Sequence, residues 1–250
     1  MVQMKASTIW YVDTSDPAAV LRAGGAPDYG AARALAGQLH PDNDVVPLPA
    51  QSLDVAAGPD SSALYVGCWP GVTVVCGAQF AVPRPSELSE ALIRPLASER
   101  TFLVGMNPDI GWGGFAHWER GVLRRSFSAT RVNILEDEGL PMVWERPFWA
   151  GEHPMSDRLP DPGRLPFDPL HFADTANWQW LGFCHDHSAA EPDLAADAPA
   201  PASIALAGFA LYPLGQAPTT HMSRDITSAG NAGRPFLNWL RRRGSRQHLH

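Results

Sequence analysis

No apolar run in this sequence reaches the roughly 18 to 20 residues that a helix needs to span a bilayer. The most apolar segments, ALYVGCW and SIALAGFALY, have the length of strands. The first residues, MVQMKASTIWYV, carry one Lys and only a short apolar run that ends at Asp13, unlike a secretory signal peptide. We therefore predict a protein without a transmembrane segment that resides in the cytoplasm.

Cysteine is scarce, and the common catalytic motifs are missing. The three cysteines, Cys68, Cys76 and Cys184, show no Cys-x-x-Cys spacing, which favours reduced buried thiols over a disulfide framework or a zinc ribbon. The sequence has no Gly-x-Ser-x-Gly elbow, no phosphate-binding Gly-x-x-x-x-Gly-Lys loop and no Gly-x-Gly-x-x-Gly after the first strand. We expect neither a cofactor nor a bound metal ion.

Charge is sparse and unevenly distributed. Only 18% of the 250 residues are charged and 45% are hydrophobic, which is enough to bury one sizeable core. Residues 214–250 hold six Arg and one Asp, which gives a charge of +5. Because the net charge of the whole chain is −7, residues 1–213 carry a net charge of −12. We predict one domain over 1–213, followed by a polar linker and an Arg-rich tail over 214–250. The acidic body argues against general nucleic-acid binding.

Strand-length segments joined by tight turns dominate the body. Hairpins are predicted over 63–82, with a Pro70-Gly71 turn, and over 112–129. The other expected elements are strands at 8–13, 101–107 and 203–213, and helices at 18–24, 29–40, 85–96 and 175–183, with Asp16, Asp28 and Asp174 as caps. Segments 133–141 and 143–149 are expected to be an acidic loop and an extended piece. The pattern indicates an α+β fold: a mostly antiparallel sheet with hairpins, a few short helices and long Pro-rich loops.

Several motifs occur together in this body. They are TIWYVD, GCWPGVTVVC followed by RPSEL, FAHWERGVLRRSFS, LEDEG, RPFWAGEHP, LPFDPL and ALAGFAL. Over residues 5–212, this combination resembles an uncharacterised family of actinobacterial proteins defined as a domain of unknown function. The resemblance implies a shared fold and no particular activity. The Arg-rich extension and the segment WLGFCHDHS depart from the family pattern, so they are interpreted on their own chemistry.

The acidic loop and the Glu-His pair in RPFWAGEHP are the candidate catalytic groups. Asp137, Glu152 and His153 around one cleft would suit a metal-assisted or acid/base hydrolase. The favoured interpretation is structural, because loop carboxylates are usually solvated or accept backbone N–H bonds, as Glu152 would in a turn at Gly151. The hydrolase is retained as the alternative function.

Residues 184–187, Cys-His-Asp-His, form the most metal-like cluster. His185 and His187 could bind one ion together only from an extended segment, whereas Cys184 and His187 could do so from a helix. Two more ligands would have to come from elsewhere in the chain. A surface helix end is therefore the favoured interpretation.

The tail segment PFLNWLRRR is the leading functional candidate. One short helix there would carry an apolar side and a basic end, while the competing interpretation is a solvated, frayed terminus. Its Arg side chains contribute about 1 kcal/mol each near an anionic membrane, which allows transient contact at most. We therefore favour a non-catalytic binding protein whose tail docks on a protein partner. The predicted partner-binding residues are Phe236, Trp239, Leu240, Arg241, Arg242 and Arg243.

Overall fold

The computed structural model describes residues 5–58, 63–155, 163–185 and 197–218. Contacts divide the chain into two units, Met1–Ala217 and Pro218–His250, and the helices and strands described here belong to the first. In this described part of the chain, no helix is long and apolar enough to cross a membrane.

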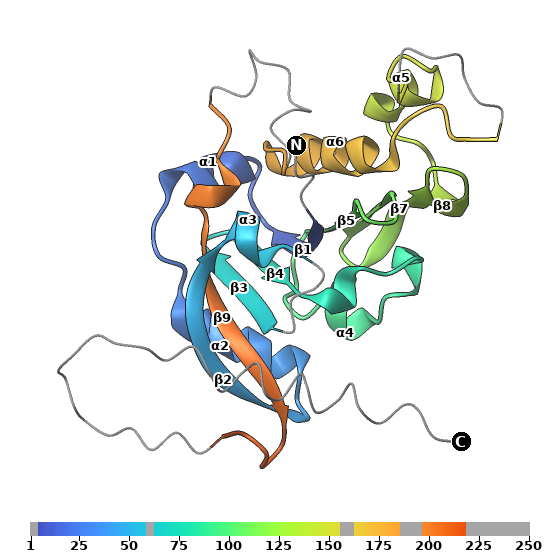
Figure 1. Cartoon of the computed structure of the whole chain (residues 1–250). Coiled ribbons are helices and arrows are strands. Elements are labelled where there is room, and N and C mark those ends of the chain that lie inside the picture. Colours follow the sequence, from blue (N-terminus) through green and yellow to red (C-terminus); the bar gives the residue numbers. More distant parts are fainter. Residues whose placement is uncertain (1–4, 59–62, 156–162, 186–196, 219–250) are drawn as a thin grey trace, which may run out of the picture. The chain divides into compact units, whose positions relative to one another are not determined.

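A single antiparallel sheet organises the fold (Figure 1). Among the described residues it has nine strands in the order β2-β9-β3-β4-β1-β5-β6-β7-β8, and every neighbouring pair is antiparallel. Strands β5 to β8 form a meander, whereas β9 lies between β2 and β3, which leaves β2 and β8 as the edges. The strands are β1 (Ala6–Val12), β2 (Asn43–Ser52), β3 (Ala63–Trp69), β4 (Val72–Cys76), β5 (Arg100–Asn107), β6 (Trp112–Glu119), β7 (Val122–Thr130), β8 (Ile134–Gly139) and β9 (Ala205–Pro213).

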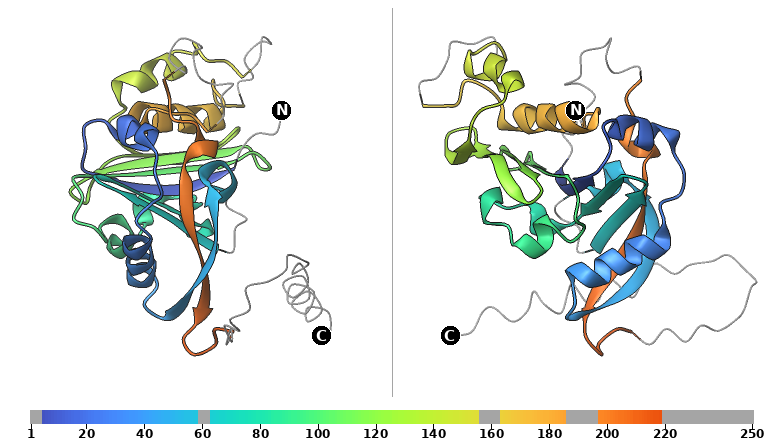
Figure 2. Two further views of the ribbon diagram at one scale, coloured as in Figure 1. Left: turned by 90° about the vertical axis from the view of Figure 1, so that its left-hand side faces the viewer. Right: turned by 180° about the vertical axis from the view of Figure 1, so that it is seen from behind.

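Helices lie on both faces of this sheet (Figure 2). The α-helices are α1 (Pro17–Ala23), α2 (Tyr29–Leu39), α3 (Leu53–Ala56), α4 (Glu90–Ile93), α5 (Arg146–Trp149) and α6 (Pro169–Leu181). The 3-10 helices are η1 (Ala78–Phe80), η2 (Pro85–Glu87), η3 (Val143–Glu145) and η4 (Pro201–Ser203).

The sheet separates two hydrophobic cores. Helix α6 packs on β5 and β6 on one face, and α2 packs on β3 and β9 on the other. Successive side chains of a strand point to opposite faces, so β1, buried along its whole length, sends Trp10 into one core and Ile9 and Tyr11 into the other. The sheet is therefore the middle of three layers.

The predicted α+β fold on an antiparallel sheet is confirmed. Both predicted hairpins are present, as β3-β4 and β6-β7, although β4 stops at Cys76 and residues 78–80 turn as η1. The predicted helix caps on the first two helices are also confirmed. The side-chain oxygen Oδ1 of Asp16 accepts a hydrogen bond from Ala19 N at 2.8 Å, and that of Asp28 accepts one from Ala31 N at 3.0 Å.

The acidic segment 133–141 is not a loop, because it contains the edge strand β8. Asp and Glu disfavour strands, but the neighbouring strand β7 offers both a backbone ladder and side-chain partners. Ser126 donates to Glu136, and Arg125 donates to Asp137. Tertiary contacts therefore override the local preference of these residues.

The segment 143–149 is helical rather than extended. It forms η3 and then α5, and Pro147 lies in the first turn of α5. Backbone N–H groups in a first turn have no acceptor within the helix, so the helix loses no hydrogen bond at proline. The segment showed no helical signal, but its one proline, Pro147, is compatible with the start of a helix.

The prediction that Asp174 caps the next helix is wrong. Helix α6 begins at Pro169, and Asp168 accepts a hydrogen bond from Leu170 N at 3.0 Å. Asp174 lies inside the helix, is buried and accepts from the backbone N of His185 at 2.7 Å. The Asp-Pro pair at 168–169 is the same start signal that identified α1.

Two further segments differ from the prediction. Residues 85–96 form the two short turns η2 and α4 instead of one helix, with the interruption at residues 88–89. Helix α4 ends at Ile93, two residues before Pro95, which cannot continue a helix. Strand β2 was not predicted, because Pro47 and Pro49 interrupt its pattern; both are tolerated there because β2 is a sheet edge.

Gly113→Ala is expected to destabilise the protein. Strand β6 and the start of α6 approach so closely that a Cβ at Gly113 would lie 2.0 Å from the carbonyl oxygen of Pro169. Helix α6 must shift to relieve this clash, so we expect the free energy of unfolding, measured in urea, to fall by about 1–3 kcal/mol.

Gly37→Ala is the matched control. Nothing lies within 4 Å of a Cβ at this position in α2, so the substitution should increase stability by about 0.5–1 kcal/mol. A Gly113 variant as stable as the Gly37 variant would contradict the close approach of β6 and α6.

Candidate functional site

The predicted Glu152-His153 pair lies at a corner after α5. Gly151 adopts a positive φ of 77°, and Glu152 N donates to Pro147 O at 2.9 Å, which closes the turn. The Glu152 side chain is exposed, and the His153 ring stacks on Phe148 with ring centroids 4.2 Å apart. The turn at Gly151 is present as expected, but no backbone N–H of the described residues donates to the Glu152 carboxylate.

Asp137, the third predicted catalytic residue, is engaged by Arg125. Its Oδ1 accepts a hydrogen bond from Nη1 of Arg125 at 2.5 Å. Among the described residues, no hydrogen bond or ion pair joins Asp137 to Glu152 or His153. In the same part of the chain, no group of three or more His, Cys, Asp or Glu side chains could hold a metal ion.

Arg125 and Glu145 form a fully buried ion pair. Both side chains are 0% exposed, and the guanidinium donates from Nε to Oε1 at 2.9 Å and from Nη2 to Oε2 at 2.8 Å. Nη1 also donates to the carbonyl oxygen of Glu138 at 3.0 Å. Burial alone would lower the pKa of Arg125, but the hydrogen bonds and charges of Glu145 and Asp137 outweigh it and raise the pKa. We call Arg125, Asp137 and Glu145 the Arg125 cluster.

The sequence contained a signal for this cluster. Strand alternation places Arg125 on the same face as Phe127, which is a core position. A charge on a core face requires a buried partner, and Glu145 is that partner. The partner could not be assigned from sequence, because η3 returns to the sheet through contacts that no local pattern encodes.

Glu136, in the segment 133–141 that was predicted to be an acidic loop, is also a buried carboxylate. Its oxygens accept hydrogen bonds from Ser86 N at 3.0 Å, from Ser86 Oγ at 2.7 Å and from the hydroxyl of Ser126. These bonds connect η2 to the edge of the sheet. Glu136 is therefore engaged structurally, like Asp137.

Two histidines are buried without hydrogen bonds. Among the described residues, both ring nitrogens of His117 and of His185 lack a partner. His117 packs against Phe102 and Trp180, with centroids 4.9 and 5.7 Å away. Burial lowers the pKa of each histidine from its usual 6.5 to about 4, so both rings are neutral at pH 7.

The predicted surface position is wrong for Cys184 and His185, the two residues of the Cys-His-Asp-His cluster that the structure describes. Cys184 and His185 are buried, because the chain after α6 turns inward, where Asn177 Nδ2 donates to Phe183 O at 2.7 Å. His187 lies outside the described residues. The predicted partner-binding residues of the tail also lie outside them, namely Phe236, Trp239, Leu240, Arg241, Arg242 and Arg243.

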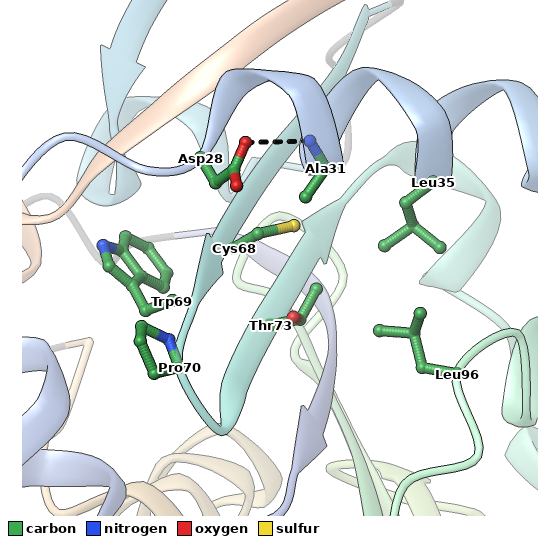
Figure 3. A pocket seen from close by; sticks show the side chains of 8 residues that line it. All are labelled: Asp28, Ala31, Leu35, Cys68, Trp69, Pro70, Thr73 and Leu96. Carbon is green, nitrogen blue, oxygen red and sulfur yellow. Dashed lines mark hydrogen bonds between the residues drawn. The ribbon is translucent and has the colours of Figure 1, made fainter.

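A cleft of about 370 Å³ lies beside the start of α2 and the β3-β4 hairpin (Figure 3). This volume is within the range of small-molecule sites, about 300–1,000 Å³. The backbone N of Asp28 donates to Cys68 O at 3.0 Å, which fixes the helix start beside the hairpin. The lining residues are Asp28, Ala31, Leu35, Cys68, Trp69, Pro70, Thr73 and Leu96.

Cys68 contributes a half-buried free thiol to this cleft. Burial raises its pKa, a hydrogen bond with Thr73 lowers it, and the negative charge of Asp28 raises it further. The net direction is upward, so the thiol stays protonated near neutral pH. The cleft thus presents a protonated thiol beside the carboxylate of Asp28. Sequence reasoning missed this site because it joins residues about forty positions apart.

The model of a family of unknown function, DUF6928, matches residues 6–209. The chain belongs to this family. No curated protein and no solved structure matches the chain. The match agrees with the expected resemblance over residues 5–212.

The DUF6928 match includes the sites that the structure describes. The Arg125 cluster, the two buried histidines and the cleft all lie within it, whereas the Arg-rich segment lies beyond residue 209. The cleft is therefore part of the family domain.

Arg125→Met should strongly destabilise the domain. It leaves Glu145 buried without a counter-charge, and removing one partner of a buried pair costs about 3–5 kcal/mol. The double variant Arg125→Met/Glu145→Gln removes both charges and should recover a large part of this loss. Urea unfolding measures all variants.

Arg124→Met is the matched control on the same strand. Arg124 pairs with Glu119 on the surface, and such exposed pairs contribute about 0–1 kcal/mol. Equal losses for Arg124→Met and Arg125→Met, or no recovery in the double variant, would rule out an unpaired buried charge as the cause.

The buried histidines should make the domain sensitive to acid. Their folded-state pKa values of about 4 lie below the unfolded value of 6.5, so the unfolded state binds more protons between these pH values. The stabilisation is complete above about pH 6.5 and is lost as the pH falls to about 4, by up to about 3 kcal/mol for each histidine.

His117→Phe tests this pH dependence. Phe keeps the stack with Phe102 and Trp180, so the difference in unfolding free energy between about pH 7.5 and pH 5 should shrink. Phe102→Leu is the control, because it perturbs the same stack without removing a titratable group. An unchanged pH dependence in His117→Phe would refute the role of this ring.

Proposed function

We propose that this chain is a cytoplasmic, non-catalytic binding protein that docks on a protein partner. The proposal rests mainly on the surface at the β8 edge of the sheet. Half of the exposed large apolar side chains in the described chain come from residues 132–149, which are β8 and the segments beside it. These side chains are Val132, Ile134, Leu140, Val143 and Trp149.

The two edges of the sheet differ in how they are protected. At the β2 edge, Pro47 and Pro49 remove two backbone N–H donors, a common protection against strand addition. Strand β8 contains no proline. Leu140 and Val143, just beyond it, are 86% and 76% exposed. An extended partner segment added along β8 would bury these side chains.

Charge at the β8 edge favours a basic partner segment. Glu136 and Asp137 are engaged by serines and Arg125, whereas Glu138 is exposed beside them. Residues 1–213 also carry a net charge of −12, which attracts positive partners over longer distances. We therefore expect an extended segment with apolar residues and Lys or Arg.

The Arg-rich tail is the second proposed binding element. Its aromatic and aliphatic side chains combined with three consecutive Arg are the residue types that concentrate binding energy in interfaces. The tail lies beyond the family match, so it would add a contact specific to this chain. Its proposed target is an acidic surface on the same partner.

The hydrolase alternative receives less support from the geometry. A general base needs hydrogen-bond reach to a common substrate atom. Asp137 is engaged by Arg125, Glu152 is exposed at a corner, and His153 stacks on Phe148. Among the described residues, no hydrogen bond, ion pair or ring contact brings these three side chains to one common atom.

Co-purification of a partner from the native cytosol tests the proposed function. The full chain should enrich a partner, measured by quantitative mass spectrometry. Leu140→Asp/Val143→Asp places charge in the proposed interface and should reduce enrichment at least about tenfold. Trp239→Ala with Arg241, Arg242 and Arg243 changed to Glu should do the same.

Ile110→Asp is the matched control, because Ile110 is 64% exposed but lies outside residues 132–149. It should leave partner recovery unchanged. The proposal fails if the full chain enriches no partner, or if Ile110→Asp reduces recovery as much as the β8-edge variant does.

A further inference from the structure

The cleft beside α2 has a graded lining. In Figure 3, Asp28, Trp69 and Pro70 lie toward one end, Leu35 and Leu96 toward the other, and Cys68 and Thr73 between them. One end thus offers a carboxylate and an aromatic ring, and the other offers only aliphatic carbon. A ligand that matches both ends has a charged or donor group on an apolar body.

Asp28 retains capacity for a ligand. Its Oδ1 caps α2 through Ala31 N, and among the described residues no hydrogen bond or ion pair reaches its Oδ2. The carboxylate is exposed at the cleft, so a donor group can approach without displacing the cap. Because the group is ionised and acceptor-only, a cationic donor is its best complement.

Trp69 adds a second preference for positive charge. Its indole Nε1 donates to Gly25 O at 3.4 Å, which holds the ring beside the loop that leads to Asp28. An ammonium near an aromatic ring gains cation–π attraction in addition to its attraction to a carboxylate. Anionic ligands are disfavoured by the same charge.

The apolar end sets the remaining requirement. Leu35 is buried and Leu96 half-buried, and both belong to or pack on the core that α2 covers. Burial of an aryl or alkyl group against them provides most of the binding free energy, at about 25 cal/mol per Å². The space between the two ends is about 370 Å³ in all, which limits the ligand to small-molecule size.

We propose that this cleft binds a small organic ammonium ion with an apolar body, with its nitrogen at Asp28 and its hydrocarbon part against Leu35 and Leu96. None of the residues that line this cleft belongs to β8 or to the tail segment. Ligand binding is therefore measured without the protein partner, and the two proposals can fail independently.

Calorimetric titration of the full chain with 2-phenylethylamine tests the site, and 2-phenylethanol serves as the neutral isostere. The amine should bind saturably and at least about tenfold more tightly than the alcohol, because only the cation gains the interaction with Asp28. No saturable amine binding, or equal affinities for the two compounds, would overturn the proposal.

Asp28→Asn removes the charge but keeps a helix cap of equal strength, so the fold is expected to persist. Amine affinity should fall about tenfold, to near that of the alcohol. Asp16→Asn is the matched control, because Asp16 caps α1 in the same way but does not line the cleft. Equal amine affinity in Asp28→Asn and Asp16→Asn would overturn the role of Asp28.

Ala31→Leu provides a test that leaves the charge in place. Ala31 is exposed on α2 and lines the cleft, so Leu is compatible with the helix and fills part of the space. Binding of the amine and of the alcohol should both weaken. Unchanged binding in this variant would show that the compounds bind elsewhere on the protein, against the proposal.

Discussion

The guanidinium of Arg125 lies out of water inside one core of the sheet, and a charge there is tolerated only with a well-oriented counter-charge. Glu145 supplies it with two parallel hydrogen bonds, and Asp137 supplies a third contact. The ion pair connects β7 to β8 and to η3, which are separated by turns. The position of the 134–149 segment, including the exposed apolar side chains beside β8, depends on these contacts together with the β7–β8 backbone ladder.

Local sequence signals predicted the helix starts and hairpins that short-range interactions, such as caps and turns, determine. Asp caps gave the starts of α1 and α2, and the Pro70-Gly71 and Glu119 to Gly121 turns gave both hairpins. Predictions failed where contacts with residues distant in the sequence determine the secondary structure. Strand β8 forms because Arg125 and Ser126 accommodate its acids, and β2 forms because a sheet edge tolerates its prolines. Neither cause is visible within a local window.

The candidate catalytic residues show the same division. Sequence proximity drew attention to Glu152 and His153, but a turn at Gly151 and a stack on Phe148 account for their contacts. The cleft, by contrast, joins Asp28 to Cys68 and Leu96, whose separation in the chain conceals their association. The cleft therefore combines a half-buried, protonated thiol with an exposed carboxylate.

The position of β9 has a consequence for synthesis of the chain. This strand, residues 205–213, pairs with β2 on one side and β3 on the other, although these are made about 160 and 140 residues earlier. Until β9 emerges from the ribosome, β2 and β3 have no common neighbour, and an unpaired strand edge remains open in the middle of the future sheet. Such an edge is prone to association with other chains. The nascent protein therefore passes through an aggregation-prone interval that ends only when β9 pairs with β2 and β3.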